Sequence, residues 1–241
     1  MSRRKRKKSN FSKIVFILFI VISIYIYFKD EIDNYILKNY TYASESYDIE
    51  NIPEYEGEPY IILDGNKPNF SDDDYQKSAF ESYSDLDYLG RTGVAFANIG
   101  TELMPKDDRE SISNVKPTGW KQAKYDIVSG GYLYNRCHLI GYQLTGENDN
   151  PNNLITCTRS MNIDGMLDFE NKVADYIKNT NNHVLYRVSP IYEDDNLLAS
   201  GVQIEASSVE DKCKDICFNV YVYNVEDGIE INYYDGSSKL A

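Results

Sequence analysis

The stretch that decides the fold reads "YNRCHLIGYQ" and covers residues 134–143. Its apolar and polar residues alternate at the start, which is typical of a β-strand. Because side chains alternate between the two faces of a strand, Arg136 and His138 should point one way while Cys137 and Leu139 point the other. An imidazole can take a proton from water near neutral pH, and a guanidinium can hold a phosphate through paired N–H donors. The pattern therefore predicts a strand that carries either a reactive pair or a hydrogen-bonded core histidine.

Further strands and one clear helix are expected on both sides of this stretch. Upstream, "PYIILDG" and "RTGVAFANIG" are typical of strands, and "SDDDYQKSAFESYSDL" between them favours a capped helix or helical turn. Downstream, the polar "TGENDNPNNLITCTRSMN" favours a loop, and "GMLDFENKVADYIKNT" has the apolar stripe of a helix. The chain closes with three strand-like segments, "HVLYRVSPIY", "SGVQIEAS" and "CFNVYVYNV". Strands and helices in this irregular order predict an α+β domain with a mainly antiparallel sheet.

The first 28 residues differ from the rest in composition. "MSRRKRKKSNFSK" carries 7 of the 25 basic residues, and "IVFILFIVISIYIYF" follows with 15 uncharged residues. No small-residue cleavage site comes next, so we expect a basic cytoplasmic tail over 1–13 and a single-pass transmembrane signal anchor over 14–28. An acidic, Tyr-rich stalk is expected over 29–58 and the globular domain over 59–241. The domain would then lie outside the cell, attached to the membrane, or secreted if the anchor is cleaved.

The charge of the chain argues against a nucleic-acid partner at first sight. Beyond the basic tail, 18 basic residues stand against 38 acidic ones, a net charge of about −20 that disfavours binding of a polyanion. Basic residues nevertheless flank the histidine in sequence, and charges beyond about 8 Å are screened at physiological salt. The flanking residues are Lys121, Lys124, Arg136, Arg159 and Lys172. A local positive groove is therefore compatible with an acidic chain.

The four cysteines show neither a metal-finger spacing nor a CxxC pair. Outside the cell, Cys213 could pair with Cys217 and Cys137 with Cys157, although connectivity cannot be read from a sequence. A cysteine hydrolase that uses Cys137 is an alternative. Because neighbours on a strand face opposite ways, its base would have to be His183, which we expect instead at the start of a strand.

Polar side chains after the strand could complete a site on the same face as His138. Asn153, Asn162 and Glu170 fall in the following loop and helix, and amide and carboxylate oxygens are ligands suited to Mg²⁺. Asn162 and Glu170 would be separated by about 12 Å along a straight helix. One of them should therefore bind the ion directly and the other through a water molecule.

At these residues the sequence resembles the DNA/RNA non-specific endonucleases of the ββα-metal type, in particular the streptococcal branch of DNA-entry and secreted nucleases. "NRCH" at 135–138 is similar to the family's DRGH motif, and "LIGYQLTG", "NPNNLIT", "MN" and "FENKV" follow in the family's order. The resemblance extends from about Tyr60 to the C-terminus. It implies a ββα-metal core and hydrolysis of DNA, with RNA as a further substrate, that depends on Mg²⁺ or on Mn²⁺ in its place. It implies no small-molecule cofactor.

The resemblance also implies a role for each residue that matches the motif. His138 would be the general base, and Arg136 the motif arginine in contact with substrate. Asn162 would bind Mg²⁺ directly, and Glu170 would orient metal-bound water from the outer shell. Asn153 would help to hold substrate or metal-bound water.

The sequence departs from the motif at two positions. Asn135 replaces an aspartate and Cys137 replaces a glycine, so a carboxylate that could position its neighbours is lost. The alternative function is a membrane-anchored, catalytically weak module for nucleic-acid binding or uptake, which the charge of about −20 favours. Nothing in the sequence indicates an oligomeric state.

Overall fold

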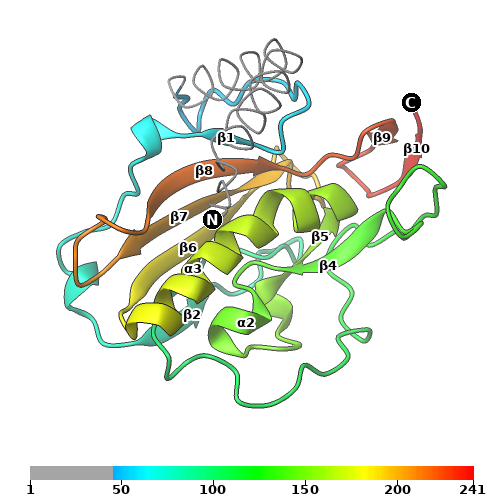
Figure 1. Ribbon diagram of the computed structural model, residues 1–241. Helices are drawn as coiled ribbons and strands as arrows, with labels where there is room; N and C mark the ends of the chain where they lie inside the picture. Colours follow the sequence, from blue (N-terminus) through cyan, green and yellow to red (C-terminus); the bar gives the residue numbers. More distant parts are fainter. Residues whose placement is uncertain (1–45) are drawn as a thin grey trace, which may run out of the picture. The chain divides into compact units, whose positions relative to one another are not determined.

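The computed structural model in Figure 1 describes residues 46–241, which form an α+β fold around one large sheet. All neighbouring strands of this sheet are antiparallel, in the order β1-β8-β7-β6-β3-β2. Its strands are β1 (Tyr60–Ile62), β2 (Phe80–Tyr83), β3 (Ala95–Ile99), β6 (Val184–Ile191), β7 (Gly201–Ser208) and β8 (Cys217–Tyr223). The expected mixed fold with a mainly antiparallel sheet is confirmed.

A smaller unit of two strands and a helix stands beside the large sheet. Strand β4 (Tyr134–His138) pairs antiparallel with β5 (Leu154–Thr158), and the chain then enters the π-helical turn η4 (Met161–Met166) and helix α3 (Leu167–Thr180). The remaining elements are short: η1 (Asp64–Asn66), η2 (Asp74–Gln76), α2 (Tyr142–Thr145), η3 (Pro151–Asn153), β9 (Ile229–Ile231) and β10 (Ser238–Leu240). The predicted strand at 134–138 therefore pairs with a partner outside the main sheet.

Helix α3 covers one face of the large sheet (Figure 1). Its buried residues include Phe169, Val173 and Ile177, which recur at helical spacing and so form one apolar stripe. The stripe belongs to the same core cluster as Tyr186 and Ile204 of the sheet. This packing fixes α3, and with it the η4 turn at its N-terminal end, relative to β4.

Two expectations about local structure need correction. The segment before β3, predicted as a capped helix or helical turn, contains the single helical turn η2, but its second half is strand β2. There Phe80 faces Asn98 across the β2–β3 pair. Pairing with β3 at the edge of the sheet therefore outweighs the helix propensity of this segment. The segment predicted as a loop after residue 145 contains β5, whose five residues are all buried. Its polar threonines and the Asn-rich turn before it gave the segment the composition of a loop, so the strand was not predicted.

The compact unit Ser46–Ala241 includes residues 46–58, which were predicted as the end of the stalk. Tyr47 forms a β-bridge with Leu63, and the Tyr223 hydroxyl donates a hydrogen bond to the Pro53 carbonyl at 3.0 Å. Residues 46–58 therefore contact the domain. The predicted tail (1–13), anchor (14–28) and first part of the stalk fall outside the described residues.

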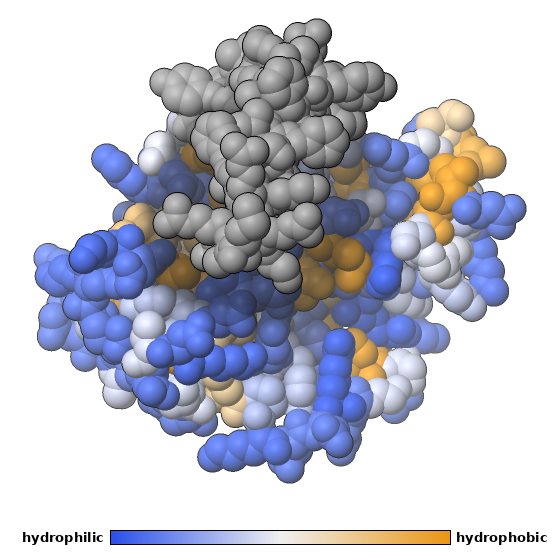
Figure 2. Space-filling model, viewed as in Figure 1, coloured by the Kyte–Doolittle hydropathy of each residue, from blue (hydrophilic) through white to orange (hydrophobic). Residues whose placement is uncertain are grey.

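The face of the described residues seen in Figure 2 is largely hydrophilic. Figure 2 shows hydrophilic residues over most of the visible face and an apolar group at the end that carries β9 and β10. Exposed Ile127 and Leu240 belong to this end, with about 60 % of each residue accessible to solvent. Between residues 46 and 241, no helix combines the length and the apolar character needed to cross a bilayer.

Both cysteine pairs considered from the sequence form disulfides, Cys137–Cys157 and Cys213–Cys217. Cys137 and Cys157 lie in the core, and neither side chain is exposed. None of the four cysteines is a free thiol. Cys137 is therefore not available as a nucleophile, which removes the cysteine hydrolase alternative.

Candidate active site

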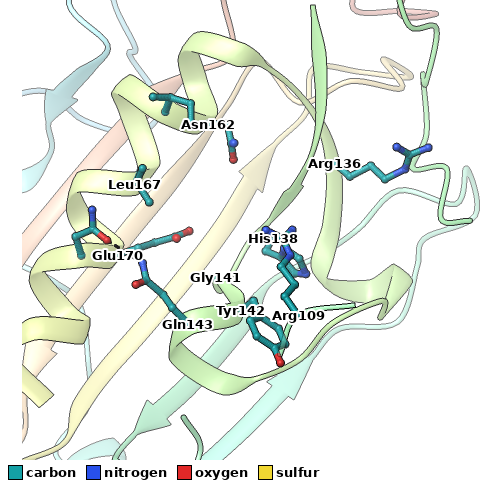
Figure 3. Close-up of a pocket in the computed structure, with 11 residues that line it drawn as sticks. Arg109, Arg136, His138, Gly141, Tyr142, Gln143, Asn162, Leu167 and Glu170 are labelled. Atoms are coloured by element: carbon teal, nitrogen blue, oxygen red, sulfur yellow. Dashed lines mark hydrogen bonds between the residues drawn. The ribbon is translucent and has the colours of Figure 1, made fainter. Parts of the chain in front are cut away.

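A cavity of about 330 Å³ opens between the end of β4, the start of α2 and the η4–α3 junction. His138, Asn162 and Glu170 all line it, as does Arg109 from the irregular segment between β3 and β4. Figure 3 shows these side chains around one hollow, with His138 and Arg109 opposite Asn162 and Glu170. The structure thus places four of the five side chains predicted from sequence, His138, Arg136, Asn162 and Glu170, at one cavity, and it adds the Arg109 guanidinium, which was not predicted.

His138 is the last residue of β4, and only 7 % of it is exposed. Its Nε2 lies 2.6 Å from the carbonyl oxygen of Asn148. Because a carbonyl can only accept, Nε2 carries the proton in the neutral ring and Nδ1 carries the lone pair. Nδ1 is 3.4 Å from a terminal guanidinium nitrogen of Arg109. The basic nitrogen of the ring is therefore the one beside the arginine of the cavity.

The surroundings of His138 favour the neutral ring. Burial is the main cause that lowers its pKa below the usual 6.5, and the positive charge of Arg109 lowers it further. The hydrogen bond to Asn148 acts in the opposite direction but is the smaller effect. The imidazole is consequently in its proton-accepting form at neutral pH.

The π-helical turn η4 explains how Asn162 and Glu170 reach the same cavity. In a regular α-helix, residues eight positions apart differ by about 80° in direction. A π-turn accommodates about one extra residue, so the same pair is spaced like residues seven positions apart and diverges by only about 20°. Both residues accordingly line the cavity. The straight helix assumed in the sequence analysis is corrected to a helix with a π-turn at its start.

Glu170 is a carboxylate held in an unfavourable place for a negative charge. Burial raises its pKa to about 7, while a hydrogen bond from Gln143 and the charge of Arg109 act in the opposite direction. The carboxylate packs against the backbone of Gly141, where an added Cβ would collide with Glu170 Oε2. The glycine is thus needed for the close approach. A partly buried carboxylate without an adjacent ion pair is suited to a bound cation.

Arg136 lines the cavity on the His138 side, as strand alternation predicts, but its donors are directed elsewhere. Its Nε donates to the Val115 carbonyl, and its Nη2 donates to the Ser113 carbonyl at 3.0 Å. The guanidinium also lies over the Trp120 ring, 4.1 Å from the centroid. Figure 3 shows the group pointing away from Glu170. Arg136 therefore supports the 113–120 segment that borders the site, and its contact with substrate stays a prediction.

Asn153 is fully buried and does not line the cavity. Its Oδ1 accepts a hydrogen bond from the Ile140 N–H at 2.9 Å, and its Nδ2 donates to the Ile140 carbonyl at 3.0 Å. Its backbone carbonyl accepts from the Leu139 N–H. Asn153 therefore fixes the backbone that follows His138, and its role in holding substrate or metal-bound water stays a prediction.

Sequence reasoning missed two residues that complete the surroundings of His138. Arg109 lies in an irregular segment without periodicity, so no pattern ties it to β4. Asn148 contributes only its backbone carbonyl, which any residue could supply. The tertiary structure alone identifies both.

The region that builds this cavity matches a known family. A sequence model of the DNA/RNA non-specific endonucleases matches residues 68–210, which include every residue of the cavity described above. The chain belongs to this family. A deoxyribonuclease from Streptococcus dysgalactiae subsp. equisimilis is 33 % identical over 124 residues. The match covers 49 % of this chain and 36 % of the deoxyribonuclease. This chain therefore spans little more than a third of the length of that relative.

Two solved structures share the fold of this endonuclease family member. NucA from Streptococcus agalactiae with a bound magnesium ion has a TM-score of 0.70 and 26 % identity, over 80 % of this chain and 92 % of NucA. Sda1 nuclease with a bound zinc ion has a TM-score of 0.64 and 25 % identity, over 81 % of this chain and 100 % of Sda1. The structural likeness thus extends over most of this chain.

Proposed function

We propose that this domain is a metal-dependent, sequence-non-specific endonuclease that hydrolyses phosphodiester bonds of DNA, with RNA as a second substrate. The observation that carries the proposal is the basic Nδ1 of His138 beside a cavity shared with Asn162, Glu170 and Arg109. A base alone would suit many hydrolases. The additional guanidinium and hard oxygen donors favour a phosphate group as the substrate.

The reaction we propose uses His138 as the general base. Nδ1 takes a proton from a water molecule as the water oxygen attacks phosphorus, and the bond to the 3′ oxygen breaks. The 3′ oxygen leaves as a hydroxyl after it gains a proton, and the phosphate stays on the 5′ end. Arg109 would donate hydrogen bonds to the phosphate oxygens, whose negative charge grows in the transition state. The bond from Nε2 to Asn148 would hold the ring in the correct tautomer and orientation.

The donor set at the opposite wall fits a hard divalent cation. Between residues 46 and 241, no group of three or more histidine, cysteine, aspartate or glutamate side chains could enclose a metal. Asn162 would thus bind the ion through its amide oxygen, and Glu170 would act through water, which suits Mg²⁺ because it keeps much of its hydration. Such an ion supplies positive charge that stabilises the transferring phosphate and the leaving oxygen. The magnesium and zinc ions named for NucA and Sda1 support a divalent metal, and we propose Mg²⁺ with Mn²⁺ as a substitute.

We further propose that the enzyme acts outside the cell, attached to the membrane by its predicted anchor or secreted if the anchor is cleaved. The composition of the first 28 residues and the two disulfides support this location. The alternative function, a binding or uptake module with weak activity, is favoured by the acidic charge of the exterior part. The positive Arg109 at the cavity argues for local attraction of a phosphate in spite of that charge.

The experiment that tests the proposal is incubation of residues 46–241 with supercoiled plasmid DNA. Mg²⁺ should give nicked and then fragmented DNA, and excess EDTA should stop the reaction. Full activity in EDTA would contradict the role of the metal. Binding of DNA without cleavage in Mg²⁺ or Mn²⁺ would favour the binding module.

A further inference from the structure

A second cavity, distant in sequence from the motif residues, is walled by tyrosines. Its volume is about 510 Å³, and it lies between residues 49–55 and the ends of β6 and β8. Tyr55 and Tyr233 form partly exposed walls, whereas Tyr221 and Tyr223 are more deeply buried. The rings of Tyr55 and Tyr223 meet edge to face at 5.5 Å, as do those of Tyr221 and Tyr223 at 5.0 Å. The result is a preformed aromatic hollow.

The charges around this hollow are negative. Glu50, Glu54 and Glu193 line it, and no lysine, arginine or histidine is among its lining residues. No ion pair within residues 46–241 uses any of these three glutamates. Burial and the charge of Glu193 raise the pKa of Tyr233 to about 12, and both residues line the same cavity. A cation would therefore be attracted to the cavity, and a polyanion repelled.

The four tyrosine hydroxyls already have partners within the protein. The hydroxyl of Tyr55 donates to Asp227 at 3.0 Å, that of Tyr223 to the Pro53 carbonyl at 3.0 Å and that of Tyr233 to the Asn224 carbonyl at 2.7 Å. The Tyr221 hydroxyl donates to Ser200 at 3.0 Å. These bonds hold the rings in place and direct the hydroxyl hydrogens into the protein. A bound cation would therefore meet ring faces and carboxylates and not hydroxyl donors.

We propose that this cavity binds a quaternary ammonium group of the choline type. Such a group carries a positive charge but donates no hydrogen bond, so it needs only a negative field and aromatic faces. The volume also accommodates a substituted nitrogen and its methyl groups. The site is separate from the nuclease chemistry and does not depend on it.

Calorimetric titration of residues 46–241 with choline chloride tests this inference. Choline should bind, and its uncharged isostere, in which carbon replaces nitrogen, should bind at least about 5-fold more weakly because it lacks the charge. Phosphocholine forms a second arm of the experiment. Tighter binding of choline would assign the site to a free alkylammonium compound, and tighter binding of phosphocholine would assign it to a lipid-type headgroup. No binding of either, or equal binding of the isostere, would overturn the proposal.

Variants locate the binding event within the molecule. Glu193→Gln should weaken choline binding, whereas Glu56→Gln, an equal charge change at an exposed residue outside the cavity, should not. Tyr233→Leu should weaken binding about 3- to 30-fold, and Tyr233→Phe, which keeps the ring, should restore most of it. Choline affinity that none of the cavity variants alters would overturn the assignment of the site. DNA cleavage is not the readout, so an inactive nuclease would leave this test intact.

Discussion

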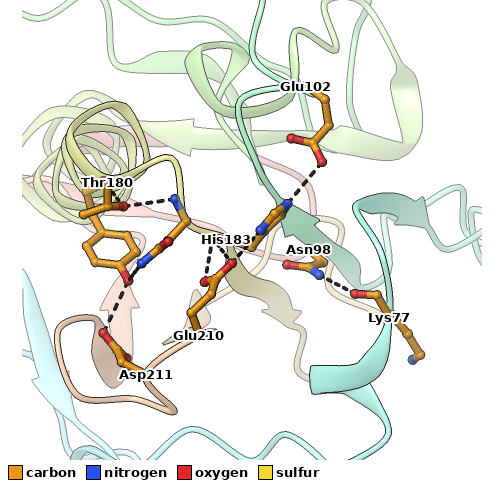
Figure 4. Close-up of polar contacts among 9 residues, drawn as sticks. Lys77, Asn98, Glu102, Thr180, His183, Glu210 and Asp211 are labelled. Carbon is orange, nitrogen blue, oxygen red and sulfur yellow. Dashed lines mark hydrogen bonds and ion pairs between the residues drawn. The ribbon is translucent and has the colours of Figure 1, made fainter.

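The only two histidines of the chain lie in opposite electrostatic surroundings. His138 is buried against a carbonyl and a guanidinium, and both burial and the arginine lower its pKa. His183, immediately before β6, lies between two carboxylates: its Nδ1 is 2.7 Å from Glu210 and its Nε2 is 3.1 Å from Glu102. Figure 4 shows this ring between its two acidic partners. The hydrogen bond to Glu210 is the largest cause that raises the pKa of His183.

The difference separates a reactive histidine from a structural one. A neutral ring whose unprotonated nitrogen lies at a cavity can accept a proton from water there, whereas a ring whose two nitrogens both bind carboxylates has no nitrogen open to water or substrate. His183 instead joins the segment after β3, the start of β6 and the turn after β7. The prediction that it marks the start of a strand is confirmed, and the structure adds its role as an ionic link.

The largest effect should come from the oxygen donor that faces His138. Asn162→Ala should reduce plasmid cleavage in Mg²⁺ by about 10²-fold or more, because the charge stabilisation supplied by a metal is worth several kcal/mol. Asn182→Ala, beside His183, is the matched control and should keep nearly full activity. Equal activity of the two variants would contradict the proposed metal position. Circular dichroism spectra should show that both are folded.

Local sequence patterns predict much of the structure around His138. The alternation around residue 138 gave the strand and the face that carries the imidazole, and the apolar stripe gave α3. The positions of Asn162 and Glu170 depended on the resemblance, because a straight helix would separate their directions. A π-turn leaves no clear sequence signal.

The rest of the site depends on contacts that sequence patterns do not encode. Asn153 and Arg136 have the residue types of substrate ligands, yet the Ile140 backbone binds both polar atoms of the Asn153 side chain, and backbone carbonyls accept from Nε and Nη2 of Arg136. Only tertiary structure shows which polar groups are already satisfied. Arg109 was missed for the converse reason, since its importance comes from a long-range approach to His138.

A smaller effect on cleavage rate should follow when a glycine beside a histidine site is replaced by alanine. Gly141→Ala places a Cβ against the Glu170 carboxylate and should displace it, with a loss of about 10- to 10²-fold in cleavage rate. Gly100→Ala places a Cβ against Glu102 and the His183 ring instead. That variant should lower the melting temperature while its cleavage rate per folded molecule stays near the wild-type value. A rate loss in Gly100→Ala as large as in Gly141→Ala would contradict the claim that only the His138 site takes part in cleavage.

The smallest effect concerns the pH dependence of stability. The raised pKa of His183 means that its ionic link contributes fully below about pH 6.5, the unfolded value, and is lost as pH rises through the higher folded value. Because the ring and its partners are partly exposed, the contribution should be less than about 1 kcal/mol. Urea unfolding should therefore show that His183→Gln costs more stability at pH 6 than at about pH 8.5. A cost that grows with pH would contradict the assigned link.

His138 should show the opposite sign in the same measurement. Its pKa is lowered in the folded state, so the wild-type protein loses stability as pH falls from about 6.5 toward the folded value, where the buried ring must take up a proton. His138→Gln should remove this acid-side loss. A stability difference between the wild-type protein and His138→Gln that stays constant below about pH 6.5 would show that the ring is not buried in its neutral form.

The central claim is that His138, and not His183, is the general base, and the most direct test compares the two alanine variants for plasmid cleavage. His138→Ala should lose about 10²-fold or more in rate while still binding DNA, and added imidazole should restore part of the activity by entering the vacated space. His183→Ala should cleave at nearly the wild-type rate. A His138→Ala protein with wild-type activity, or a folded His183→Ala protein without activity, would contradict the account.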